Sequence, residues 1–93
     1  MKYIQDIEFN IEVWKEGKTF VSYVPQLDLA SCGETVDKAR KNIREALELY
    51  FEETEKMGTL KQVLEESGFD VEKKKHWRAP EMVAFERFRL ALA

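Results

Sequence analysis

Hydrophobic and polar residues alternate strictly near the start of the chain. The apolar positions between residues 7 and 13 are Ile7, Phe9, Ile11 and Val13, each separated from the next by one polar residue. This period of two is typical of a strand with one face in solvent. A second run, residues 19–24, is rich in β-branched and aromatic residues and follows a short polar turn that contains Gly17. The two runs therefore predict a β-hairpin.

Pro25 follows the hairpin and predicts its end, because proline cannot donate a hydrogen bond to a neighbouring strand. We expect a short third strand over residues 27–32. From Thr35, a suitable N-cap residue, the spacing of apolar residues changes to that of a helix. The positions on one face of this helix are Val36, Ala39, Ile43, Ala46, Leu47 and Tyr50. The pattern predicts a long amphipathic helix that covers the sheet and reaches about Lys56, before Met57 and Gly58.

The last third of the chain predicts smaller elements. Thr59 and Gln62 have the spacing of a capping box, which predicts a short helix over residues 59–67. Gly68 suits a left-handed C-terminal cap, with Phe69 folding back near Leu64. Residues 70–79 are polar and without period, so we expect a loop there. Residues 82–92 fit neither a helix nor a strand by periodicity; we favour a strand, because a fourth strand would give the long helix a full-width surface to pack on.

Together these elements predict one α+β domain over residues 1–93, with its core in residues 3–56. The expected order is β-β-β-α-(α)-β, in two layers, with an antiparallel-rich sheet covered on one face by the long helix. The chain has 93 residues, of which 44% are hydrophobic and 35% charged, a composition typical of a soluble globular domain. No apolar stretch approaches the roughly 20 residues of a membrane span, and an acid at position 6 argues against a signal peptide. We therefore expect a cytoplasmic protein.

The chain carries little of the material from which catalytic sites are built. One histidine and one cysteine are too few for a typical zinc site, and the isolated glycines match no phosphate-binding motif. His76 lies in a basic segment without an identified partner, and Cys32 precedes the long helix without a base beside it. We interpret His76 as a surface residue and Cys32 as a half-buried structural residue. We expect no catalytic residue, no metal and no cofactor, and hence no enzyme.

Charge is divided unevenly along the chain and bears on the choice of partner. The net charge is −3, with a balance of −5 over residues 1–69 and +2 over residues 70–93. An acidic body disfavours nonspecific binding to nucleic acid, which depends on neutralising phosphates, and favours a basic protein partner.

The long helix has its charges in the unfavourable order for the helix dipole. Its basic residues precede its acidic ones, so bases lie at the positive end of the dipole and acids at the negative end. Either this order arises by chance, or it serves docking against a charged partner or an antiparallel second copy. Leu49, which lies off the apolar stripe, would then be a contact in self-association, and we expect a homodimer.

The region between the hairpin and the long helix carries a distinctive run of residues. An aromatic strand is followed by Pro25-x-Leu27, a short strand, and Gly33-Glu34-Thr35 at the start of a helix. The helix continues the run with Ala39, Asn42, Ile43, Glu45, Ala46, Leu47, Leu49, Tyr50 and Glu52. This arrangement resembles the HicB-like antitoxin family, and the resemblance covers residues 9–53. Lys38 departs from it, since the family usually has Glu there.

The resemblance implies a fold like a reduced ribonuclease H core without its active site. It also implies the function of HicB proteins, which neutralise HicA toxins, small ribonucleases that cut messenger RNA, by covering the toxin's catalytic surface. Many HicB proteins carry a C-terminal DNA-binding module, for which residues 73–93 are too short, so we expect the short form. An orphan HicB-like interaction module without a toxin remains an alternative.

Two sets of residues follow as candidate sites. For the toxin we favour the solvent-facing side of the sheet, and the predicted contacts are Glu8, Glu12, Trp14 and Asp28. An exposed tryptophan beside carboxylates suits an interface anchor, although packing at the sheet edge would explain Trp14 equally well. The alternative function is a nucleic-acid-binding accessory protein or transcriptional regulator, and its predicted contacts are Lys73, Lys74, Lys75, Trp77 and Arg78.

Overall fold

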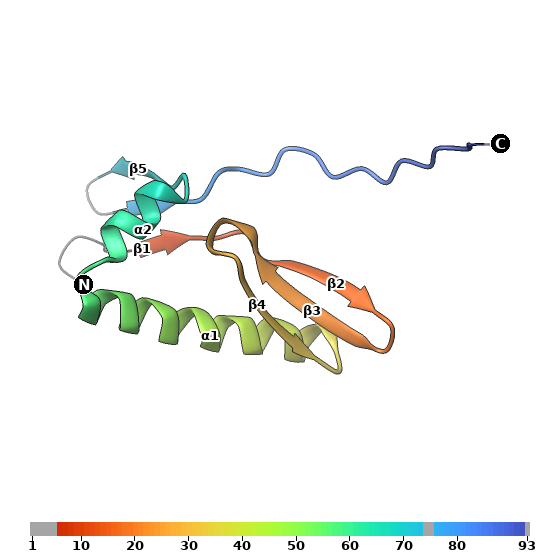
Figure 1. Ribbon diagram of the computed structural model, residues 1–93, viewed down its shortest axis with the longest axis horizontal. Coiled ribbons are helices and arrows are strands. Elements are labelled where there is room, and N and C mark those ends of the chain that lie inside the picture. Colours follow the sequence, from red (N-terminus) through yellow and green to blue (C-terminus); the bar gives the residue numbers. More distant parts are fainter. Residues whose placement is uncertain (1–5, 74–75, 93) are drawn as a thin grey trace.

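The structure is a computed structural model that describes residues 6–73 and 76–92. It confirms the α+β class. The hairpin consists of β2 (Glu12–Glu16) and β3 (Thr19–Val24), and β4 (Leu29–Gly33) pairs antiparallel with β3. These three strands form a sheet in the order β2-β3-β4, and α1 (Val36–Met57) packs along one face of it (Figure 1).

The predicted first strand is divided into two pieces that belong to different sheets. β1 (Asp6–Glu8) is separated from β2 by residues 9–11 and pairs in parallel with β6 (His76–Arg78). β6 in turn pairs antiparallel with β5 (Asp70–Lys73), which makes a second sheet in the order β1-β6-β5. The prediction of a loop over residues 70–79 is therefore wrong, because this segment folds back on itself and closes against β1.

The third strand begins later than predicted. Pro25–Leu27 form a single 3-10 turn, η1, and Asp28 follows it in the left-handed region with φ 50°. This turn reverses the chain, so that Leu29 pairs with Val24. The prediction of a strand end at Pro25 is confirmed, and the predicted strand over residues 27–32 is displaced by about two residues.

α1 begins and ends close to the predicted residues. Thr35 is its N-cap, with its side-chain oxygen accepting a hydrogen bond from the Lys38 amide at 3.1 Å. Gly58 caps the other end with φ 72°. The buried positions of α1 are Ala39, Ile43, Leu47, Phe51 and Thr54. The pattern thus missed Phe51 and Thr54, and it wrongly placed Val36 inside, since Val36 is 42% exposed.

The short helix α2 (Leu60–Glu66) is present without the predicted capping box. Thr59 is the N-cap residue but makes no side-chain cap hydrogen bond, and Gln62 bonds Glu66 instead, at 2.9 Å. The predicted cap at the other end is confirmed. Gly68 has φ 83°, and the Phe69 amide bonds the Leu64 carbonyl at 3.0 Å, which is the hydrogen bond of a Schellman motif.

The last segment is not the strand that we predicted. Within the described part of the chain, residues 79–92 are neither helix nor strand, and residues 81–92 are all exposed. We call residues 81–92 the C-terminal arm. The arm leaves β6 and runs on the side of the sheet away from α1, beyond the end of the hairpin (Figure 1).

The core lies where α1, α2 and the two sheets meet, and it extends past the predicted boundary at residue 56. Its buried apolar residues are Val24, Ile43, Leu47, Phe51, Leu60, Leu64, Phe69, Trp77 and Ala79. Phe9 lies against the rings of Phe51 and Phe69, at centroid distances of 5.2 and 5.8 Å. Phe69 and Trp77 close the core from the C-terminal third of the chain, which makes that third part of the same folded unit.

Candidate functional site

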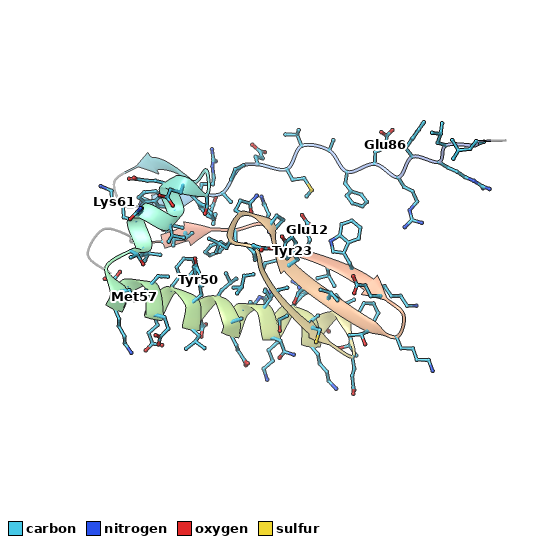
Figure 2. All side chains as sticks on the ribbon, in the orientation of Figure 1. Glu12, Tyr23, Tyr50, Met57, Lys61 and Glu86 are labelled. Atoms are coloured by element: carbon cyan, nitrogen blue, oxygen red, sulfur yellow. The ribbon has the colours of Figure 1, made fainter. Side chains whose placement is uncertain are left out.

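The three-stranded sheet has one face that no helix covers. The register places Trp14, Val21 and Cys32 in one row across the three strands, and Glu12, Tyr23 and Ala30 in the next. The opposite face carries Ser22, whose hydroxyl donates to the Ala39 carbonyl at 2.7 Å and so faces α1. We call the six residues of the two rows the open face. Glu12 and Tyr23 lie on the side of the sheet away from α1 in Figure 2.

Trp14 is the largest side chain of the open face. Its indole N–H donates to Glu12 Oε1 at 2.9 Å, and its ring lies 5.4 Å from the ring of Phe85 in the C-terminal arm. A hollow of about 280 Å³ is lined by both rings together with Met82 and residues 11–13. Trp14 is 43% exposed, so about half of this ring remains available to another molecule.

Asp28 joins the open face through Tyr23. The Tyr23 hydroxyl donates to Asp28 Oδ1 at 2.7 Å. This hydrogen bond raises the pKa of the Tyr23 phenol, with smaller contributions from burial and from the charges of Asp28 and Glu12. Tyr23 is also the cross-strand partner of Glu12. The structure thus brings Glu12, Trp14 and Asp28 together, as three of the four predicted partner contacts.

Glu8, the fourth predicted contact, belongs to a different hollow. It pairs with Arg78 across β1 and β6, and both line a cavity of about 430 Å³ with Phe9, Asn10, Ala79 and Glu81. Asn10 donates to the Pro80 carbonyl at 2.6 Å. Glu8 therefore lines a hollow different from the one that Glu12 and Trp14 line.

A second surface is the outward side of α1 in its C-terminal half. It carries five exposed glutamates around Leu49, which is 59% exposed. The glutamates are Glu45, Glu48, Glu52, Glu53 and Glu55, and we call them, with Leu49, the acidic helix face. Among the ion pairs found in the described residues, those of α1 involve only Lys38 and Arg40 in its first turns. Lys56 is the one base beyond Leu49 on this helix.

Of the predicted nucleic-acid contacts, the structure describes the side chains of Trp77 and Arg78, and they differ in exposure. Trp77 is 3% exposed and belongs to the core, so its ring is not available to stack on a base. Lys74 and Lys75 lie outside the described residues, and Lys73 is the last residue of β5. Arg78 is exposed beside Glu8. Burial of the tryptophan contradicts the part of the prediction that relied on stacking.

The two residues considered for catalysis, His76 and Cys32, lie in different surroundings. His76 Nδ1 lies 2.7 Å from Asp6 Oδ2 and links the ends of β1 and β6. Cys32 is exposed on the open face, in place of the half-buried position that we predicted, because the sheet has no second layer there.

Among residues 6–73 and 76–92, no three His, Cys, Asp or Glu side chains gather as a metal site. In the same residues, no helix combines the length and the apolar character needed to cross a bilayer.

Little in the amino-acid sequence indicates that Phe85 is a neighbour of Trp14. The only available signal was the density of apolar residues in 82–92, which we assigned to a strand.

Comparison with family models, with curated proteins and with solved structures finds no match for this chain.

Proposed function

We propose that this chain is a noncatalytic, antitoxin-like binding protein that neutralises a basic, HicA-type ribonuclease. The observation that carries the proposal is the acidic helix face, where five glutamates surround an exposed leucine on a rigid helix. A ribonuclease binds RNA through basic residues, and a protein that presents carboxylates in place of phosphates can occupy that surface. The resemblance of residues 9–53 to HicB-like antitoxins favours this class of partner, and the likeness to a reduced ribonuclease H core remains a prediction.

The order of charges in α1 supports a binding role for the acidic helix face. Carboxylates in the last turns of a helix oppose its dipole, and each exposed one costs about 0.3–1 kcal/mol near the helix end. Among the described residues, no salt bridge to these glutamates offsets the cost. A partner with basic side chains would supply the missing counter-charges, because the interaction strengthens when both surfaces lose water.

The open face is less suited to a basic partner than we predicted. Its centre is apolar or uncharged, and its two nearby carboxylates, Glu12 and Asp28, already accept hydrogen bonds from Trp14 and Tyr23. We therefore propose the reverse of the sequence-based assignment. The acidic helix face, including Leu49, contacts the toxin, and the open face serves apolar contacts.

The test uses two variants with the same change of charge at comparable places. Glu52→Lys with Glu55→Lys alters the acidic helix face, and Glu65→Lys with Glu66→Lys alters the end of α2. The partner to test is any basic protein that a short open reading frame next to this gene proves to encode, expressed to arrest growth. Wild type and the α2 variant should restore growth, and the α1 variant should not. In binding assays with purified proteins the α1 variant should lose about 100-fold in affinity, on the order of 3 kcal/mol.

Measuring the stability of the same variants provides the control for folding. Lysines near the end of α1 complement the helix dipole, so the α1 variant should be at least as stable as wild type. Loss of binding with retained stability supports the acidic helix face as the contact. Equal binding by wild type and the α1 variant would refute that surface, and no binding by wild type to any such basic protein would refute the function.

A further inference from the structure

The C-terminal arm exposes more apolar surface than any other part of the described chain. Its large apolar residues are Met82, Val83, Phe85, Phe88, Leu90 and Leu92, and each is at least half exposed. Elsewhere in the described chain, only four large apolar residues are at least 42% exposed, and they are scattered singly on the surface. Contiguous exposed apolar residues on a soluble domain mark a surface that is covered by something else.

The arm is too long for its own chain to cover. Phe85 lies against Trp14 of β2, and β2 ends only two residues later at Glu16. The arm continues seven residues past Phe85 to Leu92, and an extended chain advances about 3.3 Å per residue. The end of the arm therefore extends past the hairpin, as Figure 1 shows. The radius of gyration, 15.6 Å, exceeds the roughly 12 Å of a compact domain of 93 residues.

The open face has the properties expected of a surface that binds the arm. Five of its six residues are uncharged, and no helix covers Val21, Ala30 and Cys32. The nearby carboxylates are Glu12 in the open face itself, and Glu16 and Asp28 beside it. The outer half of the arm carries two arginines, Arg87 and Arg89, and in an extended chain they alternate with Phe88 and Leu90. The arm and the open face of one chain therefore both offer apolar residues. The arm adds positive charge, and the open face and its border add negative charge.

We propose that residues 86–92 of the arm lie on the open face of a second copy of this chain, and that the second copy returns the same contact. Such an exchange is isologous, since each chain contributes one arm and one open face, and it closes at two copies. In each chain the arm and α1 lie on opposite sides of the sheet (Figure 1). The acidic helix face therefore stays exposed in the dimer, and the exchange does not depend on the proposed function.

Sedimentation equilibrium of two double variants separates this exchange from self-association through α1. Phe88→Ser with Leu90→Ser removes apolar side chains from the arm, and Leu49→Ser with Met57→Ser removes two similarly exposed ones from α1. Neither pair belongs to the core, so both variants should fold. Wild type and the α1 variant should have about twice the 11.0 kDa mass of one chain, and the arm variant should have the mass of one. A monomeric wild type, or a dimer lost only in the α1 variant, would overturn the proposal.

A disulfide tests where the arm lies. Cys32 is the only cysteine of the chain, and it is exposed on the open face. A chain with Leu90→Cys and Cys32→Ser, mixed with wild type under mild oxidation, should form a covalent heterodimer joined through positions 32 and 90. The Cys32→Ser chain without the new cysteine is the control and should form none. A dimer by sedimentation that never gives this link would overturn the placement on the open face.

Discussion

Replacement of Gly33 by alanine should destabilise the fold strongly. Gly33 is the last residue of β4 and lies directly under the first turn of α1. A Cβ added there would lie 2.6 Å from the Ala39 nitrogen and 2.8 Å from the Lys38 carbonyl carbon. Both are backbone atoms, so no side chain can rotate away. Ordinary contact begins at 3.4 Å, so strand and helix would have to separate by about 0.8 Å.

Ala39 makes one hydrogen bond within the first turn of the helix and one that joins the helix to the sheet. The Ala39 amide donates to the Thr35 carbonyl at 2.9 Å, and the Ala39 carbonyl accepts from the Ser22 hydroxyl at 2.7 Å. Overpacking of this kind costs about 2 kcal/mol. For a domain of this size the melting temperature should fall by roughly 8–16 °C.

Urea unfolding followed by far-UV circular dichroism measures the loss, with a second glycine as control. Gly17 has φ 61° and nothing within 4 Å of an added Cβ, and asparagine tolerates the left-handed region. Gly17→Asn should therefore cost less than about 1 kcal/mol. If Gly33→Ala is as stable as wild type, β4 and α1 are not packed as closely as described, and the account of this junction is wrong.

Three further predictions concern the cap, the core and the open face. Thr35→Ala removes the side-chain cap of α1 and should cost about 1 kcal/mol in urea unfolding; an unchanged midpoint would argue against the cap. Phe51→Ala leaves a cavity beside Phe9 and should cost about 3 kcal/mol or more, whereas a loss below 1 kcal/mol would place Phe51 outside the core. The raised pKa of Tyr23 means that the hydrogen bond to Asp28 is present below pH 10, the ordinary tyrosine pKa, and that its contribution to stability is lost as the pH rises from there through the folded-state pKa. Absorbance at 295 nm should show one tyrosine titrating above pH 10 in wild type, and this transition should be absent in Tyr23→Phe and shifted downward in Asp28→Asn; no shift in Asp28→Asn would contradict the assigned cause.

Local patterns in the sequence predicted the elements whose structure depends mainly on residues within the same segment. The alternation in the hairpin and the spacing of Ala39, Ile43 and Leu47 reflect burial on a single face, and that information lies within each segment. The ends of α1 were predictable for the same reason, since Thr35 and Gly58 act on their immediate neighbours.

Contacts between distant segments were not predictable in this way. β1 is a strand because β6 pairs with it from about 70 residues away, and nothing near Asp6 indicates that partner. Trp77 was placed in a basic surface loop because its neighbours are charged, although its own side chain closes the core. The open face could be inferred from the alternation of Glu12 and Trp14, but the position of Phe85 over Trp14 depends on the path of the arm.

The arm shows a related limit of sequence patterns. Residues 82–92 have the apolar content of a strand, and within one chain the best prediction was a fourth strand of the sheet. The structure leaves them exposed, and a periodicity argument cannot distinguish a strand that pairs within its own chain from a segment that binds another molecule.

The most direct test of the central claim, that this protein acts by occupying another protein's surface, is an inhibition titration. Any basic ribonuclease that proves to be encoded beside this gene is held at a fixed concentration with a fluorescent RNA, and the cleavage rate is measured as this chain is added. The account predicts a linear fall in rate that reaches zero at equimolar chain, and no such fall with the Glu52→Lys, Glu55→Lys variant. A cleavage rate that is unchanged by excess wild-type chain, or that falls equally with the variant, would contradict it.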